Sequence, residues 1–379
     1  MQDKTSLALK LTFSAVAALA LFFIAELACR AVISAFYPGE MFSNRISSDY
    51  WEFRPDAEFE APPSSGVFIK TNSMRLRDKD LKREKKTQEV RIYCAGNSTV
   101  TGYGIDFDKI FVQRLEKKLN SRGKGIYQVI NGGVFGYTTL QSLYQFEEIG
   151  LKLGPDILVV ANMNSDMITD ALQYGSKIDD RHIRLKRLLS RSRLYAILYD
   201  TIKGRLLMNF LPNKIPVRLD PPAPRVAPDM YRANLEKYIE LAEKNNIRIV
   251  FLVLPNPSDV LDLKELERFM KEREAEKIRF FNFGNFKNRK NIMELLMAYR
   301  KITRYCPLYR GIMKETAAAH NTTLVDIPAL LQKMKHDGLL SKTPFIDEIH
   351  PDDYGHEIIA GALYEAVISK DNSNGEVSH

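Results

Sequence analysis

A long apolar stretch near the amino end is the first pattern along the chain. Residues 11–25 carry no charge, and apolar character continues past Glu26 and Arg30 to Phe36. A helix that crosses a bilayer needs about 20 mainly apolar residues. Glu26 and Arg30 are four residues apart, so on a helix they share one face and can partly neutralise each other. Residues 1–36 are therefore predicted to form a short cytoplasmic stub and a transmembrane helix.

The charges around this stretch predict its orientation. Lys4 and Lys10 precede the apolar residues and favour an amino terminus held in the cytoplasm. The remaining chain is then expected on the periplasmic or extracellular side of the membrane. A cleaved secretory signal is the alternative, because small residues suited to cleavage occur within the alanine-rich run. Both interpretations predict export.

Short apolar runs alternate with amphipathic runs from residue 90 onward. The apolar runs typical of strands are 90–94, 127–130, 156–161, 247–254 and 323–327. The runs with helical spacing are 108–120, 139–151, 234–244 and 358–369. Strands that alternate with helices form a mainly parallel sheet covered on both faces. The pattern predicts one α/β domain over residues 90–369.

Polar segments lie on either side of this domain. Residues 37–89 are polar and contain several prolines, which predicts a juxtamembrane segment. Within it, residues 75–86 hold seven basic and three acidic side chains, a composition typical of a solvated surface. Residues 370–379 are predicted to be a flexible tail.

Two stretches interrupt the alternation of strands and helices. Residues 171–225 and 259–310 are predicted to be insertions over the sheet, because the strand pattern resumes after each. The first contains six basic residues within the 13 residues 181–193. A solvated basic face is the favoured interpretation of this run, and attraction of an anionic glycan or lipid headgroup is the alternative.

Composition limits the classes of function. The chain has 379 residues, 45% of them hydrophobic, and a net charge of +8, which is typical of a folded globular protein. Despite the positive charge, no nucleic-acid-binding module is recognisable, and an exported chain is not expected to bind nucleic acid. Cys29, Cys94 and Cys306 are too far apart for a zinc or redox motif. No metal and no organic cofactor are predicted.

The first candidate for chemistry is a serine at the end of a predicted strand. Ser98, in the run Gly96-Asn97-Ser98-Thr99, directly follows the strand 90–94. In open α/β sheets, ligands bind beyond the carboxyl ends of the strands, and a helix amino terminus there offers N–H groups to negative charge. An ordinary turn with a capping serine is the alternative.

The second candidate is an Asp-x-x-His motif near the end of the chain. Asp347 and His350 are spaced to place a base and its orienting carboxylate on one loop. His356, at the start of the last helix, is expected to pack or to cap. The remaining histidines are interpreted as surface residues: His182, His320, His336 and His379.

Glycine and asparagine follow two further strands. The runs Asn131-Gly132-Gly133 and Asn162-Met163-Asn164-Ser165-Asp166 each come after a predicted strand. A glycine N–H or an asparagine side chain at that edge of the sheet can donate a hydrogen bond to an oxyanion. Four strand ends thus deliver serine, glycine, asparagine and Asp-x-x-His to one edge.

The order of these four motifs resembles that of the SGNH (GDSL-like) hydrolases over about residues 67–369. The resemblance implies a flavodoxin-like three-layer α/β/α sandwich with a mainly parallel sheet. It implies the following roles: Ser98 as nucleophile, His350 as base, Asp347 as its carboxylate partner, and Ser98, Gly133 and Asn164 as oxyanion donors. Thr71-Asn72-Ser73 with Arg77-Asp78 also resembles the membrane-anchored bacterial members.

Two positions depart from the family pattern. Asn97 stands where aspartate is usual, next to the serine. The third motif usually reads Gly-x-Asn-Asp, so Asn164 takes the asparagine position if Asn162 replaces the glycine. If Asp166 instead aligns with the family aspartate, Ser165 takes that position. Asn164 is the preferred register.

Three functions follow from this interpretation. The first is a serine esterase that acts on ester-linked acyl groups of an envelope carbohydrate or lipid through an acyl-serine. The second is an O-acyltransferase that passes the acyl group to an envelope polysaccharide at the same site. The third is a non-catalytic envelope-binding protein on the same fold. The membrane and an ester substrate are the expected partners, and protein partners are not specified by the sequence.

Overall fold

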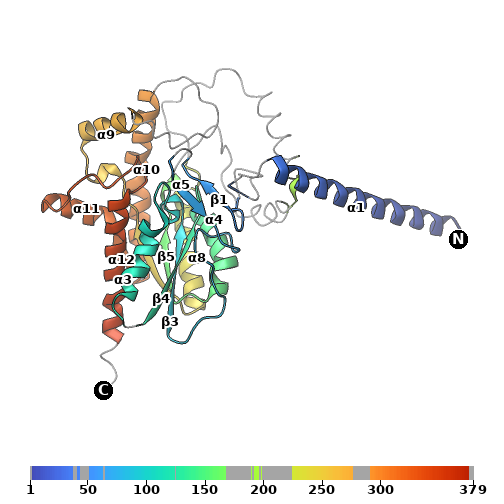
Figure 1. Cartoon of the computed structure of the whole chain (residues 1–379), viewed down its shortest axis with the longest axis horizontal. Coiled ribbons are helices and arrows are strands. Elements are labelled where there is room, and N and C mark those ends of the chain that lie inside the picture. Colours follow the sequence, from blue (N-terminus) through green and yellow to red (C-terminus); the bar gives the residue numbers. More distant parts are fainter. Residues whose placement is uncertain are drawn as a thin grey trace. The chain divides into compact units, whose positions relative to one another are not determined.

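A computed structural model of the chain (Figure 1) describes a defined set of residues. These are 2–36, 41–42, 51–62, 65–123, 125–167, 189, 192–195, 198, 224–275 and 291–374. The chain forms two compact units, Met1–Arg54 with Asp179–Val217, and Pro55–Ile178 with Arg218–His379. Most of the predicted insertion 171–225 and the end of the predicted tail lie outside the described residues.

The first unit contains one long helix. Helix α1 extends over Gln2–Phe36, and its segment Leu9–Val32 is long and apolar enough to cross a membrane, with a mean hydropathy of 2.1. Large apolar side chains are exposed around the surface of this segment. The helix and its apolar span agree with the pattern of residues 1–36.

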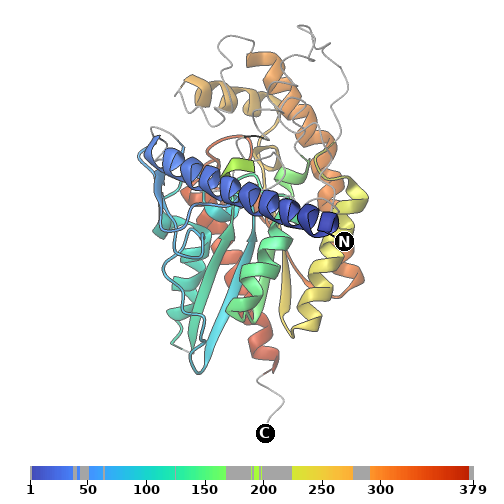
Figure 2. The same ribbon diagram turned by 90° about the vertical axis from the view of Figure 1, so that its right-hand side faces the viewer.

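The second unit is built on a five-stranded parallel sheet. The strands are β3 (Glu89–Gly96), β4 (Ile126–Gly133), β5 (Ile157–Ala161), β6 (Arg248–Val253) and β7 (Thr323–Asp326). Their order across the sheet is β4-β3-β5-β6-β7, and every neighbouring pair is parallel. Figure 2 shows them running side by side. This is the flavodoxin-like order, and the five predicted strands are confirmed.

Helices cover both faces of this sheet (Figure 1). On one face lie α3 (Phe111–Asn120) and α12 (Asp353–Asn374), which contact each other. On the other lie α4 (Thr139–Gln145), α8 (Pro228–Lys244) and α10 (Asn291–Ala319). The predicted three-layer α/β/α sandwich is therefore confirmed.

Apolar spacing explains how these helices attach to the sheet. In α3, the side chains of Phe111, Val112, Leu115 and Leu119 are buried, which is the stripe expected from an amphipathic helix. The amino end of α4 is fixed by a capping box, in which the side chains of Thr138 and Gln141 each bond the other residue's backbone N–H. The sequence pattern thus becomes a packed core between the layers.

The boundaries of several elements differ from the sequence prediction. The second unit already includes a hairpin of β1 (Glu58–Glu60) and β2 (Phe68–Lys70), which lie in the predicted juxtamembrane segment. Helix α9 covers Leu263–Ala275, and α10 continues past residue 310 because Tyr309, Ile312 and Met313 are buried in the core. A helix not predicted, α11, covers Ile327–His336. Helix α12 continues to Asn374, so the first residues of the predicted tail are helical.

Candidate active site

The folded chain brings Ser98, His350 and Asp347 into one hydrogen-bonded row. Ser98 is the first residue of the short helix α2 (Ser98–Thr101), just beyond the end of β3. Its Oγ lies 2.8 Å from Nε2 of His350. Nδ1 of the same ring lies 2.7 Å from Oδ2 of Asp347. This order of hydroxyl, imidazole and carboxylate is the arrangement in which a serine loses its proton to a histidine.

The loop around Asp347 determines which ring nitrogen carries the proton. Oδ1 of Asp347 accepts hydrogen bonds from the backbone N–H groups of Ile349 (2.9 Å) and His350 (2.7 Å). Its Oδ2 is then directed at Nδ1 of His350. Because a carboxylate can only accept, Nδ1 carries the proton and donates it to this bond. In the neutral ring, Nε2 is therefore left to accept the Ser98 proton.

The electrostatic surroundings of His350 favour its protonated form. Burial lowers the pKa of His350, but the charge and hydrogen bond of Asp347, helped by Glu348, raise it to a value above the ordinary one. Burial and the nearby Asp347 carboxylate raise the pKa of Glu348 to about 7. The imidazolium that forms when His350 takes a proton is thus stabilised by two acidic neighbours.

Glycine and asparagine explain why Ser98 lies where it does. A Cβ on Gly96 would come within 2.3 Å of Cγ2 of Val100 and 2.8 Å of the Ala161 carbonyl oxygen, so only glycine fits between β3, α2 and β5. The side chain of Asn97 caps α2 by accepting a hydrogen bond from the Thr99 N–H at 3.0 Å. Asparagine caps helices as well as aspartate does, so the departure at position 97 keeps the local geometry.

A buried arginine from the run predicted to be a solvated surface holds the turn after Ser98. Arg77 is 0% exposed. Its Nη1 donates to the carbonyl oxygens of Thr101 (2.9 Å) and Gly102 (2.7 Å), and its Nη2 donates to that of Ile105 (2.7 Å). Burial lowers the pKa of Arg77 to about 10. The planar guanidinium thus gathers three carbonyl groups that no helix or strand satisfies.

The next residue, Asp78, holds the loop that follows β4. Its Oδ2 accepts a hydrogen bond from the Asn131 N–H at 2.8 Å, and its Oδ1 accepts one from the Lys79 N–H at 2.8 Å. Burial raises the pKa of Asp78 to about 7. The neighbouring residues Arg77 and Asp78 therefore connect the turn after Ser98 with the end of β4. The Arg77-Asp78 pair in the resemblance motif was the only sequence signal of this arrangement.

The end of β4 and the loop after it, residues 131–136, offer a different candidate N–H donor from Gly133, the one predicted. The Gly133 N–H donates to Oδ1 of Asn131 at 2.9 Å, so this donor is already occupied. A Cβ at Gly133 would lie 2.2 Å from the Thr101 backbone nitrogen, which explains the need for glycine by packing. Gly136 has a left-handed φ of +71°, and no described residue accepts its N–H. Gly136 is the better candidate for an oxyanion donor.

Asn164 is buried with its polar atoms unused. It is the first residue of α5 (Asn164–Met167), and neither Oδ1 nor Nδ2 has a hydrogen-bond partner among the described residues. A buried amide without a partner is costly, unless a ligand supplies one. Asp166 instead has a structural role, because its Oδ1 accepts from the N–H (2.8 Å) and Oγ1 (2.6 Å) of Thr139. The unpartnered amide of Asn164 agrees with the Asn164 register.

Two aromatic rings lie beside His350. The ring of Tyr103 is 4.9 Å from that of His350, measured between centroids. Phe135, the neighbour of Gly136, meets Tyr103 edge-to-face at 5.1 Å. Burial raises the pKa of the Tyr103 hydroxyl, which keeps it protonated. Neither ring was singled out from the sequence, because aromatic residues near a loop give no signal of their own.

His356 packs and caps, as expected. Its Nδ1 accepts a hydrogen bond from the Phe111 N–H at 3.1 Å, at the amino end of α3. Its ring also stacks on that of Phe111. Burial and the nearby arginines lower the pKa of His356 to about 3, so the ring stays neutral and keeps this acceptor.

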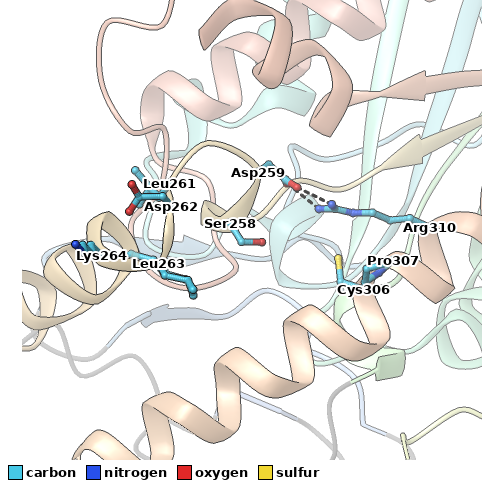
Figure 3. Close-up of a pocket in the computed structure, with 10 residues that line it drawn as sticks. Ser258, Asp259, Leu261, Asp262, Leu263, Lys264, Cys306, Pro307 and Arg310 are labelled. Carbon is cyan, nitrogen blue, oxygen red and sulfur yellow. Dashed lines mark hydrogen bonds and ion pairs between the residues drawn. The ribbon is translucent and has the colours of Figure 1, made fainter. Parts of the chain in front are cut away.

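A separate cavity of about 750 Å³ lies between α10, the start of α9 and the short helix η4 (Pro257–Asp259). In Figure 3, Arg310 crosses toward Asp259, with which it forms two hydrogen bonds of 2.6 and 2.8 Å. Leu261, Leu263 and Cys306 are part of its wall. None of the predicted site residues lines it. Among the described residues, no group of three His, Cys, Asp or Glu side chains could hold a metal ion.

Comparison with known proteins gives matches only at the level of solved structures. No protein-family model matches the chain. A search of curated proteins also finds no match. An acetyl xylan esterase is 14% identical, with a TM-score of 0.42, and the match covers 73% of this chain and 100% of that one.

Two further structures are similar to the same degree. A lipase/acylhydrolase from Enterococcus faecalis is 15% identical with a TM-score of 0.40, over 74% of this chain and 96% of that one. A GDSL-like lipase from Bacteroides thetaiotaomicron is 15% identical with a TM-score of 0.38, over 74% and 88%. Likeness at this level does not establish a function.

Proposed function

We propose that the protein is a serine esterase of the SGNH type, anchored in a membrane by α1. The single observation that carries the proposal is the hydrogen-bonded row from Ser98 Oγ through the His350 ring to Asp347, with separations of 2.8 and 2.7 Å. Ser98 and His350 are 252 residues apart in the chain, and the carboxylate bonded to the ring is buried. Unrelated surface residues are not expected to form such an arrangement. No cofactor is needed for this chemistry.

The reaction begins with the serine. Ser98 Oγ attacks the ester carbonyl carbon while its proton passes to Nε2 of His350. The charge of the resulting imidazolium is balanced by Asp347. The tetrahedral oxyanion is held by the Ser98 N–H, the Gly136 N–H and the amide of Asn164. Gly136 thus takes the place of Gly133 in the predicted set of donors. The first N–H of a helix has no acceptor within the helix, so that of Ser98 is available.

The second half of the reaction uses the same groups. The intermediate collapses, the alcohol leaves with the proton from His350, and an acyl-serine remains. Water then attacks this ester, with His350 again taking a proton, and the carboxylic acid is released. A sugar hydroxyl in place of water would give acyl transfer, so the O-acyltransferase uses an identical site.

The substrate class follows from the anchor. A helix that crosses a membrane confines the catalytic unit to within reach of the bilayer and the envelope polymers. We therefore assign ester-linked acyl groups of an envelope carbohydrate or lipid as substrate, with the catalytic unit on the periplasmic or extracellular side. Lys4 and Lys10, which precede the uncharged residues 11–25, support this orientation.

The test uses full-length protein in detergent micelles, alongside Ser98→Ala. Both are incubated with a short-chain chromogenic ester and examined by intact mass. Turnover, together with an acyl adduct that is absent from Ser98→Ala, is the expected result. Rapid acylation with slow release to water, accelerated by an oligosaccharide, would identify the transferase. A folded protein that forms no adduct with acetyl, butyryl or octanoyl esters would contradict the proposal and favour the binding protein.

A further inference from the structure

Helix α1 carries a carboxylate inside its apolar span. Glu26 lies within Leu9–Val32, yet it is only 8% exposed, whereas most of the surrounding helix surface is open. An ionisable side chain within a membrane helix is costly, and such residues face protein partners or water. A buried Glu26 therefore requires hydrogen-bond donors, and its contacts show which residues supply them.

The partner is a turn from the first insertion. Both Glu26 oxygens accept hydrogen bonds: Oε2 from Ser192 Oγ (2.8 Å) and the Leu194 N–H (2.9 Å), and Oε1 from the Arg193 N–H (2.9 Å). Arg30 adds an ion pair at 2.8 Å. Ser192 Oγ accepts in turn from the Tyr195 N–H at 3.1 Å. Residues 192–195, named here the docked turn, are thus bonded to α1 by two backbone N–H groups and the Ser192 hydroxyl.

The position of Glu26 sets the depth of the docked turn. Glu26 precedes Val32, the end of the apolar span, by six residues, which corresponds to about 9 Å along a helix. The 24-residue span is about 36 Å long, whereas the hydrocarbon core of a bilayer is about 30 Å thick. Glu26 then lies near the boundary between the core and the headgroups. Backbone groups bonded to it lie at the same depth.

Two exposed leucines accompany the docked turn. Leu189 precedes it and is 36% exposed, and Leu198 follows it and is 51% exposed. Exposed apolar side chains next to backbone whose N–H groups are satisfied by protein suit the edge of the hydrocarbon core, because an unsatisfied N–H group is costly in hydrocarbon.

We infer that the docked turn, with Leu189 and Leu198, is a second contact with the lipid bilayer, held at its depth by Glu26. This inference rests on the proposed membrane anchoring by α1 and not on the esterase activity. The contact also requires that α1 be retained, because removal of α1 as a cleaved signal would leave three donors of the docked turn without their acceptor. The docked turn contacts the boundary between acyl chains and headgroups in the leaflet that holds the carboxyl end of α1.

Lipid-borne quenching of tryptophan tests the contact in the full-length protein. The chain has one tryptophan, so Trp51→Phe provides the background. On it, Leu198→Trp places an indole beside the docked turn, and Ile126→Trp is the matched variant on the sheet domain, since Ile126 is 49% exposed. Phe22→Trp, on α1, reports the anchor itself. Each variant is reconstituted in nanodiscs with and without dibrominated phosphatidylcholine.

The expected result is quenching of the indoles at positions 22 and 198 by at least twofold, with little change at position 126. Glu26→Ala should reduce quenching at position 198 to the level of position 126. Glu26→Gln, which keeps one acceptor oxygen, should give an intermediate value. Quenching at position 22 without quenching at 198 would overturn the contact, and quenching at 198 that Glu26→Ala does not change would overturn the role of Glu26. Absence of quenching at position 22 would overturn the anchor. Ester turnover does not enter any of these readings.

Discussion

The guanidinium of Arg77 donates a hydrogen bond of 2.7 Å to the carbonyl oxygen of Gly102, four residues after Ser98. Gly102 has a left-handed φ of +82° and ends α2, so its carbonyl cannot join a helix. The position of the proposed nucleophile thus depends on a charged side chain from a segment that precedes the sheet.

Removing this guanidinium should destabilise the second unit strongly. Arg77→Met removes the donor from the buried carbonyls of Thr101 and Ile105 and leaves that of Gly102 with only the Ile105 N–H at 3.2 Å, and each carbonyl left without a donor costs about 1–3 kcal/mol. We expect a loss of about 3 kcal/mol or more in the free energy of unfolding, measured by chemical denaturation. Arg83→Met, at an exposed position of the same basic run, should change it by about 0.5 kcal/mol or less. Equal effects of both variants would contradict the role of Arg77.

Asp347→Asn should impair hydrolysis without unfolding the loop. The variant presents an amide to Nδ1 of His350 and favours the ring tautomer with its proton on Nε2, which cannot accept from Ser98. A fall in kcat of about 10⁴-fold is expected, as in other serine hydrolases. Asp353→Asn, on the exposed start of α12, is the control and should keep full activity. An Asp347→Asn variant within tenfold of the parent enzyme would rule out the proposed role of Asp347.

The pH dependence of hydrolysis should report the acidic neighbours of His350. The base must be neutral, so kcat/KM should rise with pH through a midpoint above about 6.5, the ordinary value for histidine. Glu348, whose pKa is about 7, is charged above that pH and raises the pKa of His350. Glu348→Gln should therefore move the midpoint to lower pH, and Glu348→Asp should move it less. A midpoint that stays unchanged in Glu348→Gln would show that this carboxylate does not act on the base.

The two registers of the third motif predict opposite results. If Asn164 holds the oxyanion, Asn164→Ala should lower kcat by about 10² to 10³-fold with little change in KM. Ser165→Ala should then behave like the parent enzyme. Steady-state kinetics on both variants, with thermal unfolding to verify the fold, decides between them. Loss of kcat in Ser165→Ala alone would favour the alternative register.

Asp166 should make the stability of the second unit depend on pH. Burial raises the pKa of Asp166 to about 7, above the 3.8 of an exposed aspartate, so the folded state binds a proton that the unfolded state has lost. Between these values, raising the pH therefore lowers the stability. In Asp166→Asn, Oδ1 can still accept from Thr139, and this dependence should be absent.

The measurement is the difference in Tm between the parent protein and Asp166→Asn from pH 5 to pH 8. The difference should move in favour of the variant as the pH rises and become constant above about pH 7. Asp108→Asn, at an exposed position, should follow the parent protein. A constant difference over the whole range would show that Asp166 does not titrate in the folded state.

Local patterns predicted much of this arrangement. The strand runs, the capping residues and the Asp-x-x-His spacing depend on neighbours within a few residues, and such signals are present in the sequence itself. Arg77 and Asp78 show the limit, because a basic and acidic run is typical of a solvated surface. Their burial depends on partners that only the fold brings near: the carbonyl of Thr101, 24 positions after Arg77, and the N–H of Asn131, 53 positions after Asp78.

By itself, the sequence determined the apolar helix, the alternation that builds a parallel sheet, and the delivery of Ser98, Asn164 and His350 to one edge. These follow from hydrophobic periodicity and from the rule that parallel strands share their carboxyl ends. Only the tertiary structure decided that the Gly133 N–H donates to Asn131, that no described residue accepts the Gly136 N–H, and that Glu26 accepts from Ser192. Hydrogen bonds are directional and short, so which N–H is occupied depends on positions accurate to less than an ångström, and no pattern of residue types contains that information.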